Sequence, residues 1–199
     1  MDDTTAYRVT RAFRRFNRLM VLMWRLGLGR VVNAWPQVIG QIMVLSHTGR
    51  RTGLQRRTPL NYLERDGVIY AIAGFGPSTD WYRNVRANPQ VVVWLPGQCF
   101  TGIVEDVSDS PDRLALVRGV LVASGFAAPA AGIPVHRLDD AELAAQTADY
   151  RVLRIVPRPD GPQPAAPADL AWVWLPVGAV GCAVILVRSC QTGAIAPVW

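Results

Sequence analysis

Residues 41–73, QIMVLSHTGRRTGLQRRTPLNYLERDGVIYAIA, decide the fold class of this chain. Three runs rich in β-branched and aromatic side chains, residues 41–46, 57–63 and 68–73, predict three strands. Asp66-Gly67 separates the last two, and both residue types tolerate the positive φ angles of a tight hairpin turn. Strands joined by so short a turn run antiparallel, so an antiparallel sheet is expected.

The pattern continues downstream of this stretch. Further strands are expected at residues 91–95, 99–107 and 150–156, with Pro96-Gly97 as a second, weaker turn. Helices are expected at residues 80–87 and 112–124, the first with Thr79 or Asp80 as its N-cap. Together these elements predict one small α+β domain, a size that 199 residues can supply.

An amphipathic helix is expected at residues 7–26, near the N-terminus. Its apolar side chains fall on one side and its arginines opposite, and Gly27 and Gly29 mark its end. The apolar set is Val9, Phe13, Phe16, Met20, Met23 and Trp24; the arginines are Arg8, Arg11, Arg15, Arg18 and Arg25. Two interpretations stay open: a helix that packs on the core, or an arm that lies on anionic lipid.

The C-terminal part of the chain divides into a linker and an apolar segment. Residues 157–167 are rich in proline and alanine, and residues 170–187 carry no charge, enough for a helix of about 27 Å. This segment either spans a membrane or folds onto the domain. We therefore expect four parts: 1–39 as N-terminal helix and connection, 40–157 as the α+β domain, 158–168 as linker, and 169–199 as a hydrophobic C-terminal helix.

Arginine supplies every basic side chain, and lysine is absent. Residues 1–57 contain eleven arginines and two acids, whereas the remainder contains ten arginines and thirteen acids. This end of the chain is suited to anions. No nucleic-acid-binding motif, metal-ligand spacing, disulfide framework or secretory signal is present, so we expect a protein of the cytoplasm or of the cytoplasmic face of the membrane.

Two clusters could carry chemistry. Residues 48–53, TGRRTG, followed by Arg56 and Arg57, combine flexible backbone with cationic side chains, either as an anion cradle or as an ordinary basic hairpin. Residues 74–84, GFGPSTDWYRN, place two aromatics at a helix start, where a planar ring could stack or the aromatics could pack in the core. Neither a Walker loop nor a GxGxxG fingerprint is present. His47 is expected to be structural, satisfied by a local hydrogen bond.

Taken in order, TGRRTG, RDG, GFG and DWYRNVRANP resemble the deazaflavin-dependent nitroreductase family of F420-dependent quinone and nitro reductases. The resemblance covers roughly residues 40–157. It implies a split β-barrel of the FMN-binding type with flanking helices. It also implies coenzyme F420, a deazaflavin with a phosphate and an oligoglutamate tail, as cofactor.

The resemblance also implies roles for individual residues. The phosphate and acidic tail would be held by Arg50, Arg51, Thr52, Gly53 and Arg56, and the deazaflavin ring would be lined by Ala73, Gly74, Trp81 and Tyr82. Tyr62 and Tyr82 could donate a proton or hydrogen bond to the reduced acceptor. Phe75, where some members have a polar residue, favours an apolar acceptor.

The activity so implied is hydride transfer from reduced F420 to a quinone, nitro or other electrophilic acceptor, with the protein fixing geometry. A lipid-soluble quinone would suit attachment to a membrane. Two alternatives stay open: a membrane-tethered, non-catalytic F420-binding protein, and an FMN- or haem-binding protein on a similar split barrel.

Overall fold

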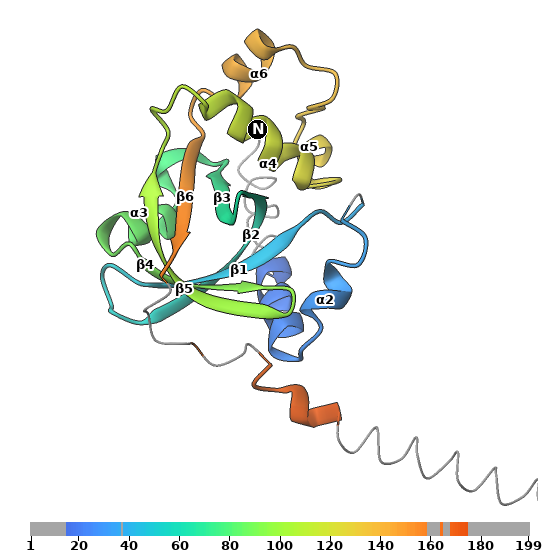
Figure 1. Cartoon of the computed structure of the whole chain (residues 1–199), viewed down its shortest axis with the longest axis vertical. Helices are drawn as coiled ribbons and strands as arrows, with labels where there is room; N and C mark the ends of the chain where they lie inside the picture. The colour runs from blue at the N-terminus through green and yellow to red at the C-terminus, as the bar shows by residue number, and fades with distance from the viewer. Residues whose placement is uncertain (1–14, 37, 159–163, 165–167, 175–199) are drawn as a thin grey trace, which may run out of the picture.

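The structure is a computed structural model and describes residues 15–36, 38–158, 164 and 168–174 (Figure 1). Its strands are β1 (Ile42–Thr48), β2 (Gln55–Arg65), β3 (Val68–Ala73), β4 (Gln90–Leu95), β5 (Gln98–Asp106) and β6 (Arg151–Pro157). They close into a barrel in the order β1-β2-β3-β6-β5-β4, and every neighbouring pair is antiparallel. The α+β class with an antiparallel barrel is therefore confirmed.

Two turns connect strands as the sequence indicates. Asp66 and Gly67 both have positive φ, 54° and 74°, and join β2 to β3. Gly97 has a φ of 89° between β4 and β5. Along each strand alternate side chains face the barrel interior, as Met43 and Leu45 of β1 do. This alternation gives the barrel one core inside and further apolar layers outside.

The helices flank the barrel. They are α2 (Gly29–Val32), α3 (Asp80–Ala87), α4 (Arg113–Ala123), α5 (Ala127–Ala130) and α6 (Asp140–Gln146), with short 3₁₀ turns η1 (Gly76–Ser78) and η2 (Ala171–Val173). The prediction for α3 is confirmed residue for residue, and Thr79 is its N-cap, but the Thr79 hydroxyl donates to Gly76 O instead of capping the helix. The α4 to α6 layer covers the outer side of β3 and β6, whereas α3 adds Tyr82 and Val85 to the barrel core.

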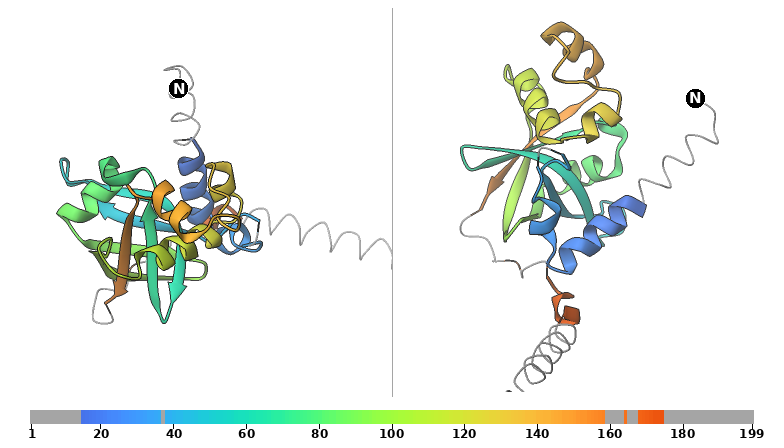
Figure 2. Two further views of the ribbon diagram at one scale, coloured as in Figure 1. Left: turned by 90° about the horizontal axis from the view of Figure 1, so that it is seen from above. Right: turned by 90° about the vertical axis from the view of Figure 1, so that its right-hand side faces the viewer.

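A third apolar layer lies under the N-terminal helix, of which residues 15–25 are described. Met20 and Trp24 pack there with Ile42, Val44 and Trp94. Figure 2 shows the helix lying along the outside of the barrel. Gly27, with a φ of 80°, follows the helix end. Packing on the core is thus observed for one side of this helix, and residues 7–14 of the predicted helix lie outside the described residues.

The C-terminal segment returns to the end of that helix. Arg25 Nη2 lies 2.6 Å from Asp169 Oδ2, and Trp174 Nε1 donates to Leu26 O at 2.9 Å. No helix within the described residues has the length and apolar character needed to cross a bilayer. Of the predicted apolar segment, residues 175–187 lie outside the described residues, and the division of the chain into four parts remains a prediction.

Candidate functional site

The connection between β1 and β2 is a compact loop that presents cations. Gly53 N donates to Gly49 O and Gly49 N donates to Leu54 O, both at 2.8 Å. Gly53 has a φ of 67°, and no described atom lies within 4 Å of the position a Cβ would take there. Arg51, Thr52, Gly53 and Arg56 are all exposed. Their backbone and guanidinium groups are therefore accessible to an anion.

Arg50, in the same loop, has a different environment. Its Nη2 lies 2.9 Å from Asp80 Oδ1, and its Nη1 donates to Asn84 Oδ1 at 2.9 Å. The backbone N of Arg50 donates to the same Asn84 oxygen at 3.1 Å. The hydrogen bond from Arg50 lowers the pKa of Asp80. Arg50 therefore fastens the loop to the first two turns of α3, and its guanidinium is already partnered by protein groups.

His47 supports this attachment from within the barrel wall. It is only 3% exposed, and its Nε2 lies 3.1 Å from Thr58 Oγ1. Asn84 Nδ2 can only donate, so at 3.4 Å it requires a lone pair on His47 Nδ1, which leaves the imidazole proton on Nε2. Burial, with the charge of Arg56 adding to it, lowers the pKa of His47 to about 4. The structural role expected of His47 is confirmed, in a chain of contacts that ends at Arg50.

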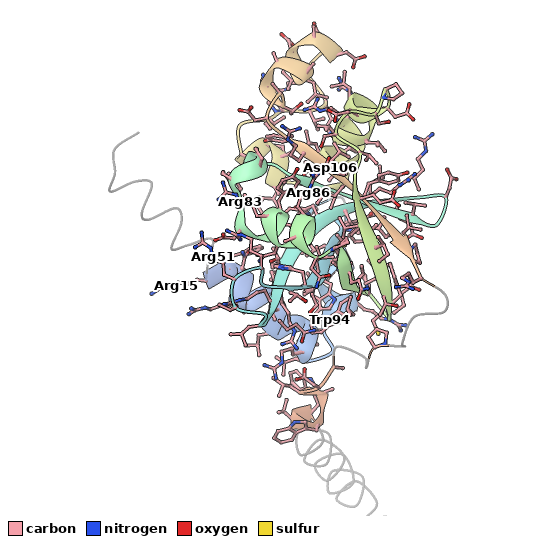
Figure 3. All side chains as sticks on the ribbon, turned by 90° about the vertical axis from the view of Figure 1, so that its left-hand side faces the viewer. Arg15, Arg51, Arg83, Arg86, Trp94 and Asp106 are labelled. Carbon is pink, nitrogen blue, oxygen red and sulfur yellow. The ribbon has the colours of Figure 1, made fainter. Side chains whose placement is uncertain are left out.

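Further exposed arginine side chains lie on or near α3. Arg51 and Arg56 form no ion pair with any described residue, and Arg83 donates from Nε to Pro77 O at 3.2 Å. Figure 3 shows Arg51 and Arg83 along one edge of the molecule. Arg83 and Asn84 were not expected as site residues. Their positions three and four residues after Asp80 place them on its side of the helix, a signal that was available in the sequence.

The segment after β3 carries the residues expected to line a ring. Ala73 is buried in the barrel core, and a Cβ at Gly74 would lie 3.4 Å from Tyr150 Cζ, so this backbone packs against an aromatic ring. Phe75 is 72% exposed. Trp81, at the start of α3, is partly buried against the barrel core. These residues lie at the end of β3 and at the start of α3.

Tyr82 has its hydroxyl committed to a carboxylate. It is 8% exposed, and its Oη donates to Asp106 Oδ2 at 2.5 Å, where Arg86 Nη1 also binds at 2.9 Å. Burial by itself would raise the pKa of Asp106, but hydrogen bonds from Ser108 and Tyr82 hold it below its usual value. Burial, then the bond to Asp106, raises the pKa of Tyr82. Tyr82 thus ties α3 to the end of β5 as a neutral donor.

Tyr62 belongs to the same buried cluster as Ala73 and Tyr82. It is 7% exposed in the barrel core, on the strand position opposite Ala71, and burial raises its pKa. The structure therefore brings the β1–β2 loop and α3 together, with Arg50, Arg51, Trp81 and Tyr82 on these two elements. The Tyr62 side chain is part of the barrel core.

The donor set fits an anionic, planar group. Two exposed guanidinium groups have no ion-pair partner among the described residues: Arg51 on the loop whose backbone is open at Gly53, and Arg56 at the start of β2. Such groups bind phosphate and carboxylate through charge-assisted hydrogen bonds. The indole of Trp81 offers an apolar ring on the element to which that loop is fastened.

Comparison with known proteins gives a family match. Residues 16–133 match the family described as F420H(2)-dependent quinone reductase. Among solved structures, an F420-H2 dependent reductase, FDR-A, is 22% identical over 58% of this chain and 93% of that one, with a TM-score of 0.43. A putative pyridoxamine 5'-phosphate oxidase from Listeria innocua is 15% identical over 66% and 94%, also with a TM-score of 0.43. The haem storage protein HutZ from Vibrio cholerae is 13% identical over 64% and 88%, with the same score.

Proposed function

This chain belongs to the F420H(2)-dependent quinone reductase family, and from that premise we propose that Arg51 and Arg56 hold the acidic part of its cofactor. Membership makes the protein an oxidoreductase that uses coenzyme F420 and transfers a hydride to a quinone. The proposal assigns the phosphate and the carboxylate tail of that cofactor to the exposed β1–β2 loop, with Thr52 and the backbone of Gly53 as further donors.

One observation carries this assignment. Arg50 and Arg51 are neighbours in sequence, yet Arg50 is bound to Asp80 and Asn84 while Arg51 has no ion-pair partner among the described residues. An arginine already neutralised by protein carboxylate gains less from a ligand anion than an unpaired one does. The free guanidinium groups are therefore the ones that a cofactor phosphate would neutralise.

The remaining residues fix geometry. When bound, the reduced deazaflavin supplies the hydride, so the protein has to orient the ring and the acceptor. Arg50, Asp80 and Asn84 hold the loop at a set distance from α3, and hence from Trp81. We propose that Trp81, with Ala73 and Gly74, lines the ring.

The acceptor side is proposed to be apolar. Phe75 follows Gly74, is largely exposed and presents a hydrophobic surface. A quinone or another neutral electrophile such as a nitro compound suits such a surface better than a charged acceptor does.

The two tyrosines expected as proton donors are both buried. Tyr82 would have to leave Asp106 before it could serve, and Tyr62 lies in the barrel core. We propose that Tyr82 acts mainly by holding α3 in place.

The cofactor assignment is tested with Arg51→Ala and Arg56→Ala. Each should weaken F420 binding by about 1.5–3 kcal/mol, roughly ten- to a hundredfold, because a charge-assisted hydrogen bond is lost. Titration of cofactor fluorescence measures the change. Arg65→Ala is the matched control, because Arg65 is also exposed, at the far end of β2, and its Nε lies 3.7 Å from Asp66 Oδ2. Unchanged affinity in both site variants would remove the assignment.

A further inference from the structure

Arg151, the first residue of β6, lies on the inner face of the barrel, at the end of β3 that leads to Gly74. It is the strand partner of Ala73, and the next inner pair along the ladder is Ala71 with Leu153. Partners directly opposite one another in an antiparallel ladder share a face of the sheet, and the side chains of Ala71, Ala73 and Leu153 are all in the barrel core. We call this end of the barrel, marked by Ala73 and Arg151, the mouth.

The guanidinium of Arg151 has no protein group to neutralise it within the described residues. The residue is partly buried, its Nε is buried, and its side chain forms no hydrogen bond or ion pair with any of the residues that the structure describes. Removing water from a charged group costs free energy unless another group takes the place of that water. The position of Arg151 therefore favours an anion beside it.

The carboxylate at the mouth is already bound elsewhere. Asp106 of β5 is the strand partner of Leu153, which places it on the inner face as well. Its Oδ2 accepts from Tyr82 Oη at 2.5 Å and from Arg86 Nη1 at 2.9 Å. Figure 3 shows Arg86 and Asp106 beside one another. Asp106 is therefore neutralised by Arg86 and leaves the charge of Arg151 uncompensated.

The charge of Arg151 acts on the residues proposed to line the ring. Burial raises the pKa of Tyr82, and the positive charge of Arg151 acts in the opposite direction. Tyr82 and Ala73 belong to one buried cluster, and Gly74 follows Ala73 in the chain. An anion that meets Arg151 at the mouth would thus lie next to the proposed position of the ring.

We propose that Arg151 stabilises the negative charge that develops on an oxygen of the acceptor during its reduction. When a quinone takes up a hydride with its electron pair, the cofactor is oxidised by two electrons and one quinone oxygen becomes an oxyanion, which a proton from water then neutralises. A guanidinium that is already in place and partly shielded from water stabilises such an oxygen without having to reorganise. The inference rests on the proposed position of the ring beside Ala73 and Gly74.

Two quinones that differ in charge test the proposal without turnover. Lawsone is a hydroxynaphthoquinone that is an anion at neutral pH, whereas its methyl ether is neutral and has nearly the same shape. Quenching of tryptophan fluorescence in the cofactor-free protein measures the binding of each. Arg151→Gln should weaken binding of lawsone by about tenfold or more, because a charge-assisted hydrogen bond is lost, and should leave binding of the methyl ether unchanged.

Reduction of the neutral quinone menadione in a single turnover supplies the kinetic test. Arg151→Gln should lower the rate by about a hundredfold, while the affinity for F420 in a fluorescence titration stays the same. Arg151→Lys should recover part of the rate, because it keeps the charge but not the planar fork. Guanidinium chloride at millimolar concentration should raise the rate of Arg151→Ala, and sodium chloride at the same concentration should not.

Arg154→Gln is the matched control for these measurements. Arg154 lies on the same strand, but its partner positions are Tyr70 and Glu105, and its guanidinium forms an ion pair with Glu105. The side chain alternates with Leu153 and Ile155 and so lies on the outer face of the barrel. This variant should bind lawsone and reduce menadione like the wild type.

Four results would overturn the proposal. The first is a rate of Arg151→Gln within about threefold of the wild-type rate, and the second is an equal loss of affinity for lawsone and its methyl ether. The third is a loss of F420 affinity as large as the loss of rate, which would make Arg151 a cofactor-binding residue. The fourth is lower thermal stability without rescue by guanidinium, which would make its role structural. Failure of the proposed cofactor site is distinguishable, because it shows in the Arg51 and Arg56 variants.

Discussion

Acidification should destabilise this protein through His47. The ordinary histidine pKa of 6.5 applies to the unfolded chain, whereas burial lowers the pKa in the folded protein to about 4. As pH falls, the unfolded chain takes up the proton first, so the free energy of unfolding decreases below about pH 7 and the loss is complete below about pH 4. The two pKa values give a loss of about 2 kcal/mol at pH 5 and about 3 kcal/mol at full protonation.

Urea unfolding of the wild type and of His47→Gln, measured at a series of pH values, isolates this contribution. Glutamine is neutral at every pH, so the variant keeps the pH dependence that comes from carboxylates and loses the part that comes from the imidazole. Between pH 7 and pH 5 the free energy of unfolding should fall by about 2 kcal/mol more for the wild type than for the variant.

Parallel curves would refute the reasoning, because they would mean that His47 accepts a proton as readily in the folded protein as in the unfolded chain. The contact with Asn84 Nδ2 opposes this, since a protonated Nδ1 would face another donor. In the folded protein His47 stays mostly neutral down to about pH 5, so its titration should not change cofactor affinity between pH 7 and pH 5.

Three further outcomes are expected. Tyr82→Phe should lower the free energy of unfolding by about 1–2 kcal/mol, because the hydrogen bond to Asp106 is lost. The rate of quinone reduction by F420H2 in a stopped-flow assay should stay within about threefold of the wild-type rate. A far larger loss of rate would make the Tyr82 hydroxyl catalytic. Asn84→Ala should weaken cofactor binding by about 1 kcal/mol in a fluorescence titration, because the β1–β2 loop is no longer held; unchanged affinity would make that attachment irrelevant to the site. Gly40→Ala should cost about 3 kcal/mol in urea unfolding, since Gly40 has a φ of 90° and an added Cβ would lie 2.4 Å from Ser124 O; a cost under about 1 kcal/mol would show that the backbone relaxes there.

Strand positions were predictable because their signals are local. Alternation of side chains and the Asp66-Gly67 turn placed each of the six strands within two residues of its observed bounds. The α6 helix was missed although its start carries a capping box, in which Asp139 accepts from Glu142 N and Glu142 accepts from Asp139 N. The four-residue helix α5 has too few residues to show a helical period. The closing pairs β1–β4 and β3–β6 join segments far apart in the chain, and no local pattern specifies them.

The site was predictable in composition but not in detail. TGRRTG correctly indicated a basic connection between two strands, and the start of α3 is where the sequence predicts it. The different environments of Arg50 and Arg51 could not be read from two identical neighbours, because Asn84, 34 residues further on, decides which of them is bound. Likewise the partner of Tyr82 is Asp106, on another strand.

Closure of the barrel has a consequence for how the enzyme can associate and be altered. In the closed order every strand has two neighbours, so none of the six is an edge strand over its whole length. β2 is the strand with the most one-sided pairing, since residues 55–61 pair with β1 and residues 62–65 pair with β3. A foreign strand would therefore find at most a short stretch of β2 on which to pair. Insertions, by contrast, should be tolerated best at the exposed tip formed by Asp66 and Gly67, which makes that tip a suitable place to graft a label.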